Sequence, residues 1–373
     1  TDICLPMVLR RFLLMLCLLG LLAGNLRAQA PKYSNEFLSI GVGARALGLS
    51  NAFTALANDA TAGYWNPAGL TRIQSNLQLS LMHTQYFAGI ARYDYGSLAF
   101  RSGDNNLFAL SYIRFGVDDI PDTSELIDPE GNINYDRIRS FSASDNAVFF
   151  SYARLFPSVE NLRIGANAKI IRRTAGSFAG AWGFGLDIGL QYQWKAWHFA
   201  AVGRDITSTF NAWSYDFSEE MREVFTLTGN EIPKSSLEVT LPRVVLGAAR
   251  QFYFREDFGL QASLDMVITT DGRRNVLIKG DPFSLDPSLG LEFSYKNLVF
   301  LRTGLGSYQR YTHEDESYGG GMQLNMGLGI NLGERLSIDY ALTDVGDQSV
   351  ALYSNIFSLR FNIDRRERTE PQE

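Results

Sequence analysis

The chain has 373 residues, of which 46% are hydrophobic and 20% are charged. Its net charge of -6 and its isoelectric point near 5.3 exclude the broad basic face of a nucleic-acid-binding protein, so no nucleic-acid partner is expected. Both cysteines, Cys4 and Cys17, lie close to the N-terminus. The rest of the chain therefore has no material for a disulfide framework or a thiolate zinc site.

The first segment in chain order is typical of a secretory signal peptide. Arg10 and Arg11 precede an apolar run from Phe12 to Gly24, and a small residue suited to cleavage follows at Ala28. The apolar run is shorter than the roughly 20 residues that a membrane-spanning helix needs. The sequence therefore predicts a signal peptide over residues 1–28 and an exported mature chain.

Residues 29–72 are rich in glycine and alanine and lack the alternation of a strand. Small residues allow the backbone to pack closely in a confined space, so we expect a small N-terminal hatch inside a larger fold. A disordered leader is disfavoured, because Phe37, Phe53 and Trp65 would then be exposed. The expected hatch motif consists of Gly41, Gly43, Ala44, Arg45, Gly48, Asp59, Trp65, Asn66, Pro67 and Gly69.

Residues 73–363 show hydrophobic alternation in period two. Between Ala181 and Trp194, one face carries Trp182, Phe184, Leu186 and Ile188, and the other carries small or polar residues. Segments of about ten residues with this pattern are the signature of transmembrane strands. The sequence predicts an all-β fold, a transmembrane antiparallel β-barrel of about 14 strands. A soluble β-sandwich would instead have a charged outer face.

The connections between the predicted strands alternate between short and long. Short periplasmic turns and long extracellular loops are typical of bacterial outer-membrane barrels. We therefore expect a multi-pass barrel in the cell outer membrane, in contact with its lipid, with both termini periplasmic. Residues 364–373 are then a charged periplasmic tail.

One long connection, predicted as a loop from Thr207 to Leu237, is unusually aromatic. Ser218 is a candidate N-cap for a short helix within it. Exposed aromatic residues at this density favour either a protein-binding surface or a mouth that captures lipid. The residues expected to bind a partner are Trp213, Tyr215, Phe217, Met221 and Phe225.

The sequence offers no enzyme active site. The three histidines, His83, His198 and His313, are far apart, and none has the spacing of a metal site. No Gly-x-Ser-x-Gly element is present. We therefore predict no catalytic residues, no metal and no cofactor.

Several stretches resemble the PorV/PorQ-type outer-membrane proteins of the Bacteroidetes. They are residues 37–48, Asn58-Asp59, Tyr64 to Leu70, Arg204 to Trp213 and Leu241 to Gly247. The resemblance implies a 14-stranded barrel related to the FadL fatty-acid channels, whose hatch also carries an Asn-Pro-Ala element, here Asn66 to Ala68. The chain departs from the Pro-Asp-Ala-Arg pattern expected of PorV, because it has Gly43-Ala44-Arg45.

Three functions remain open at this point. The resemblance implies participation in type IX protein secretion, with secretion-system proteins and secreted cargo as partners. A FadL-like channel would instead admit a hydrophobic small molecule that meets the hatch and leaves through a gap in the wall. The third alternative is a barrel with a purely structural role.

Overall fold

The computed structural model describes residues 34–123, 126, 131–255, 257–312, 318–345 and 354–364. The predicted signal peptide and residues 365–373 of the predicted tail lie outside the described residues. Among the described residues, no helix is both long and apolar enough to cross a membrane.

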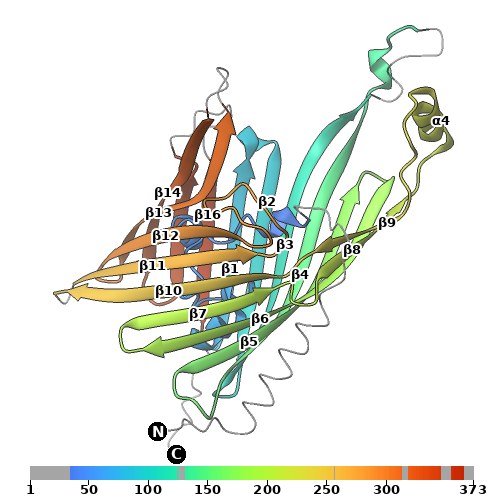
Figure 1. The fold of residues 1–373 in the computed structure, drawn as a ribbon. Coiled ribbons are helices and arrows are strands. Elements are labelled where there is room, and N and C mark those ends of the chain that lie inside the picture. Colours follow the sequence, from blue (N-terminus) through green and yellow to red (C-terminus); the bar gives the residue numbers. More distant parts are fainter. Residues whose placement is uncertain are drawn as a thin grey trace, which may run out of the picture.

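Antiparallel strands make up most of the structure (Figure 1). They are β1 (Leu77–Tyr86), β2 (Ala91–Ser102), β3 (Asn106–Asp122), β4 (Arg139–Leu155), β5 (Leu162–Ala175), β6 (Ala179–Trp194), β7 (Trp197–Arg204), β8 (Thr209–Tyr215), β9 (Ser236–Thr240), β10 (Arg243–Phe254), β11 (Phe258–Thr269), β12 (Ser284–Tyr295), β13 (Val299–Thr312), β14 (Tyr318–Leu332), β15 (Leu336–Thr343) and β16 (Ser354–Ile363).

The strands form a closed barrel with 14 positions, as predicted. β1 pairs with β16, and β5 pairs with β6, which closes the ring. β7 and β8 both pair with β6, one along each half of it. In the same way, β10 pairs with β7 and β9 pairs with β8. β8 and β9 therefore continue β7 and β10 beyond a short break, and they add no position to the ring.

The alternation in the sequence sets which side chains face outward. In β6, Trp182, Ile188 and Leu190 are exposed, whereas Ala181 and Asp187 are buried. Exposed apolar side chains recur around the outside of the barrel, as expected for a wall that faces lipid. The prediction of an apolar outer face and a small or polar inner face is confirmed for this strand.

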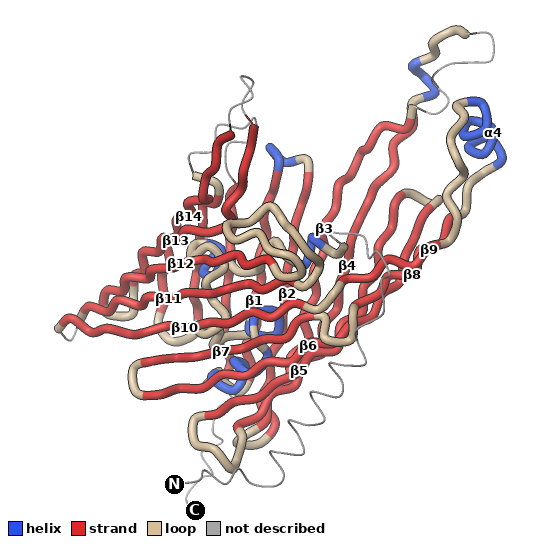
Figure 2. The backbone as a smooth tube through the Cα atoms, in the orientation of Figure 1, coloured by secondary structure: helices blue, strands red, loops and turns tan. Residues whose placement is uncertain are grey.

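The N-terminal segment fills the inside of the barrel (Figure 2). It contains the short helices η1 (Glu36–Leu38), α2 (Ala44–Leu47), α3 (Ala62–Trp65) and η2 (Pro67–Arg72), and nearly all of its apolar side chains are buried. The remaining helices, η3 (Phe87–Gly89), η4 (Tyr135–Arg137) and α4 (Glu219–Leu227), lie in connections between strands. Residues 34–75 form a compact plug inside the ring of strands, and we call these residues the hatch.

The prediction of a loop from Thr207 to Leu237 is wrong at both ends. Residues 209–215 form β8, and residues 236–237 begin β9. The alternation of β7 resumes after a break at Asp205 and Ser208, which have positive φ angles of 56° and 58°. Because neither residue is glycine, the residue types do not reveal a local break after which strand pairing resumes. The predicted helix is confirmed, with Ser218 as its N-cap, accepting from the N–H of Met221.

Candidate functional site

A buried chain of charges anchors the hatch to the wall. Arg45 donates to both carboxylate oxygens of Glu292, each at 2.9 Å. Glu292 also accepts from Arg302 at 2.6 Å, and Arg302 donates to Asp339 at 2.6 Å. Two arginines and two carboxylates therefore neutralise one another inside the barrel. Buried charges need such partners, because an unpaired buried charge has a large desolvation free energy. Arg45 also donates to Asn58 at 2.9 Å, which ties the ion chain to a second part of the hatch.

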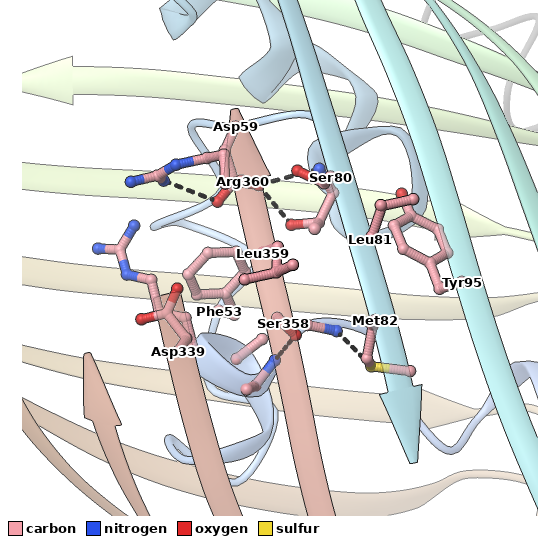
Figure 3. A pocket seen from close by; sticks show the side chains of 15 residues that line it. Phe53, Asp59, Ser80, Leu81, Met82, Tyr95, Asp339, Ser358, Leu359 and Arg360 are labelled. Atoms are coloured by element: carbon pink, nitrogen blue, oxygen red, sulfur yellow. Dashed lines mark hydrogen bonds and ion pairs between the residues drawn. The ribbon is translucent and has the colours of Figure 1, made fainter. Parts of the chain in front are cut away.

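Wall side chains also bind the hatch on the side of β1 and β16 (Figure 3). Ser358 accepts from the N–H of Ala44 at 2.8 Å, and the sulfur of Met82 accepts from the N–H of Gly43 at 3.0 Å. Arg360 donates to Asp59 at 3.2 Å. A cavity of only about 20 Å³ lies among these residues. That volume holds about one water molecule, so it is not a site for a solute.

The Trp65 to Gly69 part of the hatch motif is held by its own backbone and by β6. Trp65 donates from its indole nitrogen to the Val42 carbonyl at 2.9 Å. Asn66 accepts from the N–H of Ala68 at 3.1 Å and donates to the Leu190 carbonyl at 3.0 Å. Pro67 and Gly69 lie in η2.

Glycines allow close approach between hatch and wall. A Cβ on Gly165 of β5 would lie 2.5 Å from both the Ala68 nitrogen and the Pro67 carbonyl carbon. Gly48 of the hatch lies against Gly327 of β14. Gly41 and Gly43 have φ angles of 103° and 85°, which side chains other than glycine rarely adopt.

The wall has an unpaired seam between β12 and β13. The two strands pair from Tyr295↔Val299 to Leu289↔Leu305. Beyond that point, residues 284–288 still pair with β11, but no described residue of β13 pairs with them. β13 has a register shift between Gly306 and Gln309 and continues against β14. The ladder between the two strands ends at this level, although Gly306 still lies close to Ser288, and we call residues 284–288 and 306–309 the seam.

A cavity of about 290 Å³ lies between the hatch and the wall at the seam. Hatch residues Ser50, Thr54 and Trp65 form one side of it. Seam residues contribute another side, and the ends of β7, β10 and β11 complete it. Its charged lining residues are Glu36, Arg204, Arg243, Asp265, Arg274 and Asp286. Its volume is near the lower end of about 300–1,000 Å³ for small-molecule sites, so it suits one small solute.

The connection between β11 and β12 is fastened to the hatch beside this cavity. Arg274 pairs with Asp271 at 2.6 Å and with Glu36 of the hatch at 3.2 Å. Burial by itself raises the pKa of Asp271, but the hydrogen bond and charge of Arg274 outweigh it, so this pKa lies below its ordinary value. The pair therefore stays ionised at neutral pH and holds the connection in place.

The predicted partner-binding residues pack mainly on one another. Trp213 and Tyr215 lie in β8, where their rings stack at 6.2 Å, and Tyr215 stacks on Phe217 at 5.8 Å. Phe225 of α4 meets Phe217 edge to face at 5.1 Å, whereas Met221 lies half-buried on the same helix. Trp213 donates to Glu238 at 2.8 Å. These aromatic side chains thus stabilise the β8–β9 hairpin, with Phe217 buried and Trp213, Tyr215 and Phe225 half-buried.

The two histidines that the structure describes, His83 and His198, lie in different strands and share no site. His83 and Asp94 lie 2.6 Å apart on the exposed surface, His198 is in β7, and His313 is outside the described residues. Within the described ranges, no group of three or more histidine, cysteine, aspartate and glutamate residues could hold a metal ion.

The fold is similar to that of outer-membrane hydrocarbon channels. The toluene transporter TbuX of Ralstonia pickettii has a TM-score of 0.54 at 14% identity, covering 86% of this chain and 98% of that chain. The CymD monoaromatic hydrocarbon channel has a TM-score of 0.55 at 15% identity, covering 87% and 98%. The P. putida toluene transporter TodX has 0.50 at 14%, covering 87% and 99%.

No protein-family model matches the chain, and no curated protein matches its sequence. At these identities, the likeness to solved structures establishes the fold alone. The chain therefore has a FadL-like barrel fold, the architecture of outer-membrane channels. The more specific resemblance to PorV/PorQ proteins stays an expectation.

Proposed function

We propose that this protein is an outer-membrane channel that admits one small, partly apolar solute from the cell exterior. The observation that carries the proposal is the cavity of about 290 Å³ between the hatch and the unpaired seam. A solute there would lie between the hatch and the part of the wall where the ladder between β12 and β13 is interrupted. In this proposal both termini are periplasmic and the β8–β9 hairpin is extracellular.

The fold and the lining support a ring-sized solute. TbuX and TodX are named as toluene transporters, and CymD is named as a monoaromatic hydrocarbon channel. In this chain, Trp65, Tyr308 and the valines Val245 and Val267 provide apolar surface within the cavity. A small ring with a polar substituent would bury its apolar body against them.

Type IX secretion is the second candidate function. It is favoured by the β8–β9 hairpin, which carries α4 away from the barrel (Figure 1). Leu227 and Leu237 on this hairpin are 86% and 62% exposed. Exposed leucines on a projecting hairpin are suited to contact with a secretion-system protein or its cargo.

Purification of the protein from its native outer membrane distinguishes the two functions. If the protein is a channel, a small molecule should co-purify with it, and no other protein should co-purify in an equimolar amount. Secretion predicts that translocon proteins or cargo co-purify, and that Leu227→Ser with Leu237→Ser removes them, because interface anchors typically contribute about 2 kcal/mol or more. Loss of protein partners in that double variant would favour secretion over the channel.

A further inference from the structure

The cavity has two ends of opposite charge. Arg204 of β7 and Arg243 of β10 are direct partners across the two strands. Asp265 of β11 pairs with Ser288, and Asp286 of β12 pairs with Val267, so the two carboxylates are diagonal neighbours. Like charges at such positions destabilise a sheet. Two arginines together at one end and two aspartates together at the other are therefore costly for the fold.

The positive end is only partly neutralised. Arg243 lies 3.6 Å from Asp205, but Lys169 contacts the same carboxylate at 2.5 Å and also contacts Asp187 at 2.8 Å. Arg204 lies over the Tyr64 ring at 4.8 Å and donates to the Tyr64 carbonyl at 3.4 Å. Three cations thus share two carboxylates, and an excess positive charge remains beside the cavity.

The negative end is compensated mainly by hydrogen bonds, and the charge of Arg204 also acts on Asp265. Asp265 accepts from the N–H groups of Phe53 and Thr54 at 3.1 and 2.8 Å. Asp286 accepts from the N–H of Tyr308 across the seam. Neither aspartate makes an ion pair with any residue that the structure describes. A carboxylate in such a place is stabilised strongly by any cation that reaches it.

We infer that the cavity selects a small zwitterion, a molecule with a carboxylate, an ammonium group and a compact apolar body. The carboxylate faces Arg204 and Arg243, where guanidinium groups match its geometry. The ammonium faces Asp286, and the apolar body lies along Trp65 and Tyr308. This inference rests on the proposed function, and it replaces a neutral hydrocarbon with a dipolar solute.

The two ends are close enough for one molecule. Arg243 pairs with Thr269 of β11, and Asp286 pairs with Val267 of the same strand. Their levels differ by two residues, roughly 7 Å along the strand, and β10 and β12 lie two strand spacings, roughly 10 Å, apart across the sheet. Arginine and aspartate side chains reach into the cavity from both levels, so the gap left for the solute is that of a single small molecule.

Four probes with the same ring test the inference: phenylalanine, 2-phenylethylamine, 3-phenylpropanoate and ethylbenzene. They carry both charges, the ammonium alone, the carboxylate alone and neither. Binding to the purified full chain is measured by calorimetry in detergent. We expect phenylalanine to bind at least tenfold more tightly than each of the other three.

Two variants separate a direct role from a structural one. Asp286→Asn should weaken phenylalanine and 2-phenylethylamine while leaving 3-phenylpropanoate unchanged, and Arg243→Gln should weaken phenylalanine and 3-phenylpropanoate only. Asp257→Asn, in the turn between β10 and β11, is the matched control and should change none. A general loss of folding would weaken the binding of all four probes together and would not reproduce this difference between probes.

The outcomes distinguish the inference from the proposed function. Ethylbenzene binding as tightly as phenylalanine would overturn the zwitterion and leave the channel standing. Binding of none of the four probes would overturn both. Equal effects of Asp286→Asn on all probes would also count against the assignment of this residue to the ammonium group.

Discussion

The contact between Gly165 and the hatch gives the sharpest test of how the plug is seated. In Gly165→Ala, the added Cβ would lie 2.5 Å from backbone atoms of Pro67 and Ala68, whereas real Cβ contacts are rarely closer than 3.4 Å. Wall and hatch must therefore separate by about 0.5–1 Å, and overpacking of this kind typically costs about 1–3 kcal/mol. If the cost falls on the seated hatch, the displaced state becomes about 5–150 times more populated.

Conductance in planar bilayers measures that displaced state. Gly165→Ala should open intermittently where the parent protein is silent, and its hatch amides should exchange hydrogen faster. Gly96→Ala is the control, because its Cβ would meet only the Leu81 side chain at an ordinary 3.6 Å. Equal conductance and equal exchange in the two variants would refute the reasoning that glycine at 165 seats the hatch.

Three further predictions concern the anchors and the topology. Arg45→Met removes one of the two arginines that neutralise the buried carboxylate of Glu292 and leaves Arg302, so it should destabilise the hatch by up to about 3–5 kcal/mol in urea titrations followed by hatch-specific exchange, and full stability would contradict the anchor. Because the pKa of Asp271 is depressed, its stabilisation is complete above about pH 4 and is lost as the pH falls further, which hydrogen exchange of residues 270–283 should report. A cysteine at Asn230 should label on intact cells and one at Ser158 should not; the reverse would overturn the orientation.

Local periodicity explains why the barrel could be predicted from the sequence. In strands such as β6, outward apolar residues alternate with inward small or polar residues, and this pattern can be recognised without knowledge of the neighbouring strands. The hatch could be anticipated for a similar reason, since residues 41–48 are too small to form a core of their own. Within this motif, Gly48 lies against Gly327 of the wall and Arg45 pairs with Glu292, whereas Gly41 packs on other hatch residues.

The cavity and the seam could not be predicted in the same way. Asp265 and Asp286 look like ordinary inward polar residues of two strands, and only strand pairing reveals that they are neighbours. The seam is a place where two neighbouring strands are not paired, although both segments have the sequence pattern of a strand. Arg204 and Arg243 lie in stretches that carry the family resemblance, but the resemblance assigns no role to their positive charge.

The aromatic segment shows the opposite error. The sequence assigns Trp213 and Tyr215 to a loop, whereas they lie in β8, because the chain breaks at Asp205 and Ser208 and then resumes as a strand. A second break, at Leu241-Pro242, separates β9 from β10. Both interruptions lie side by side in neighbouring strands, so the pairing resumes beyond them. Single-strand patterns cannot show that two breaks compensate each other.

Solute uptake through purified protein in liposomes tests the central claim most directly. Ser288→Phe places a ring in the cavity at the seam, whereas Leu289→Phe, one residue along β12, points outward and is the control. With labelled phenylalanine as the solute, the account predicts that Ser288→Phe lowers uptake at least tenfold and that Leu289→Phe matches the parent protein. Undiminished uptake by folded Ser288→Phe would contradict the claim that solute passes through this cavity.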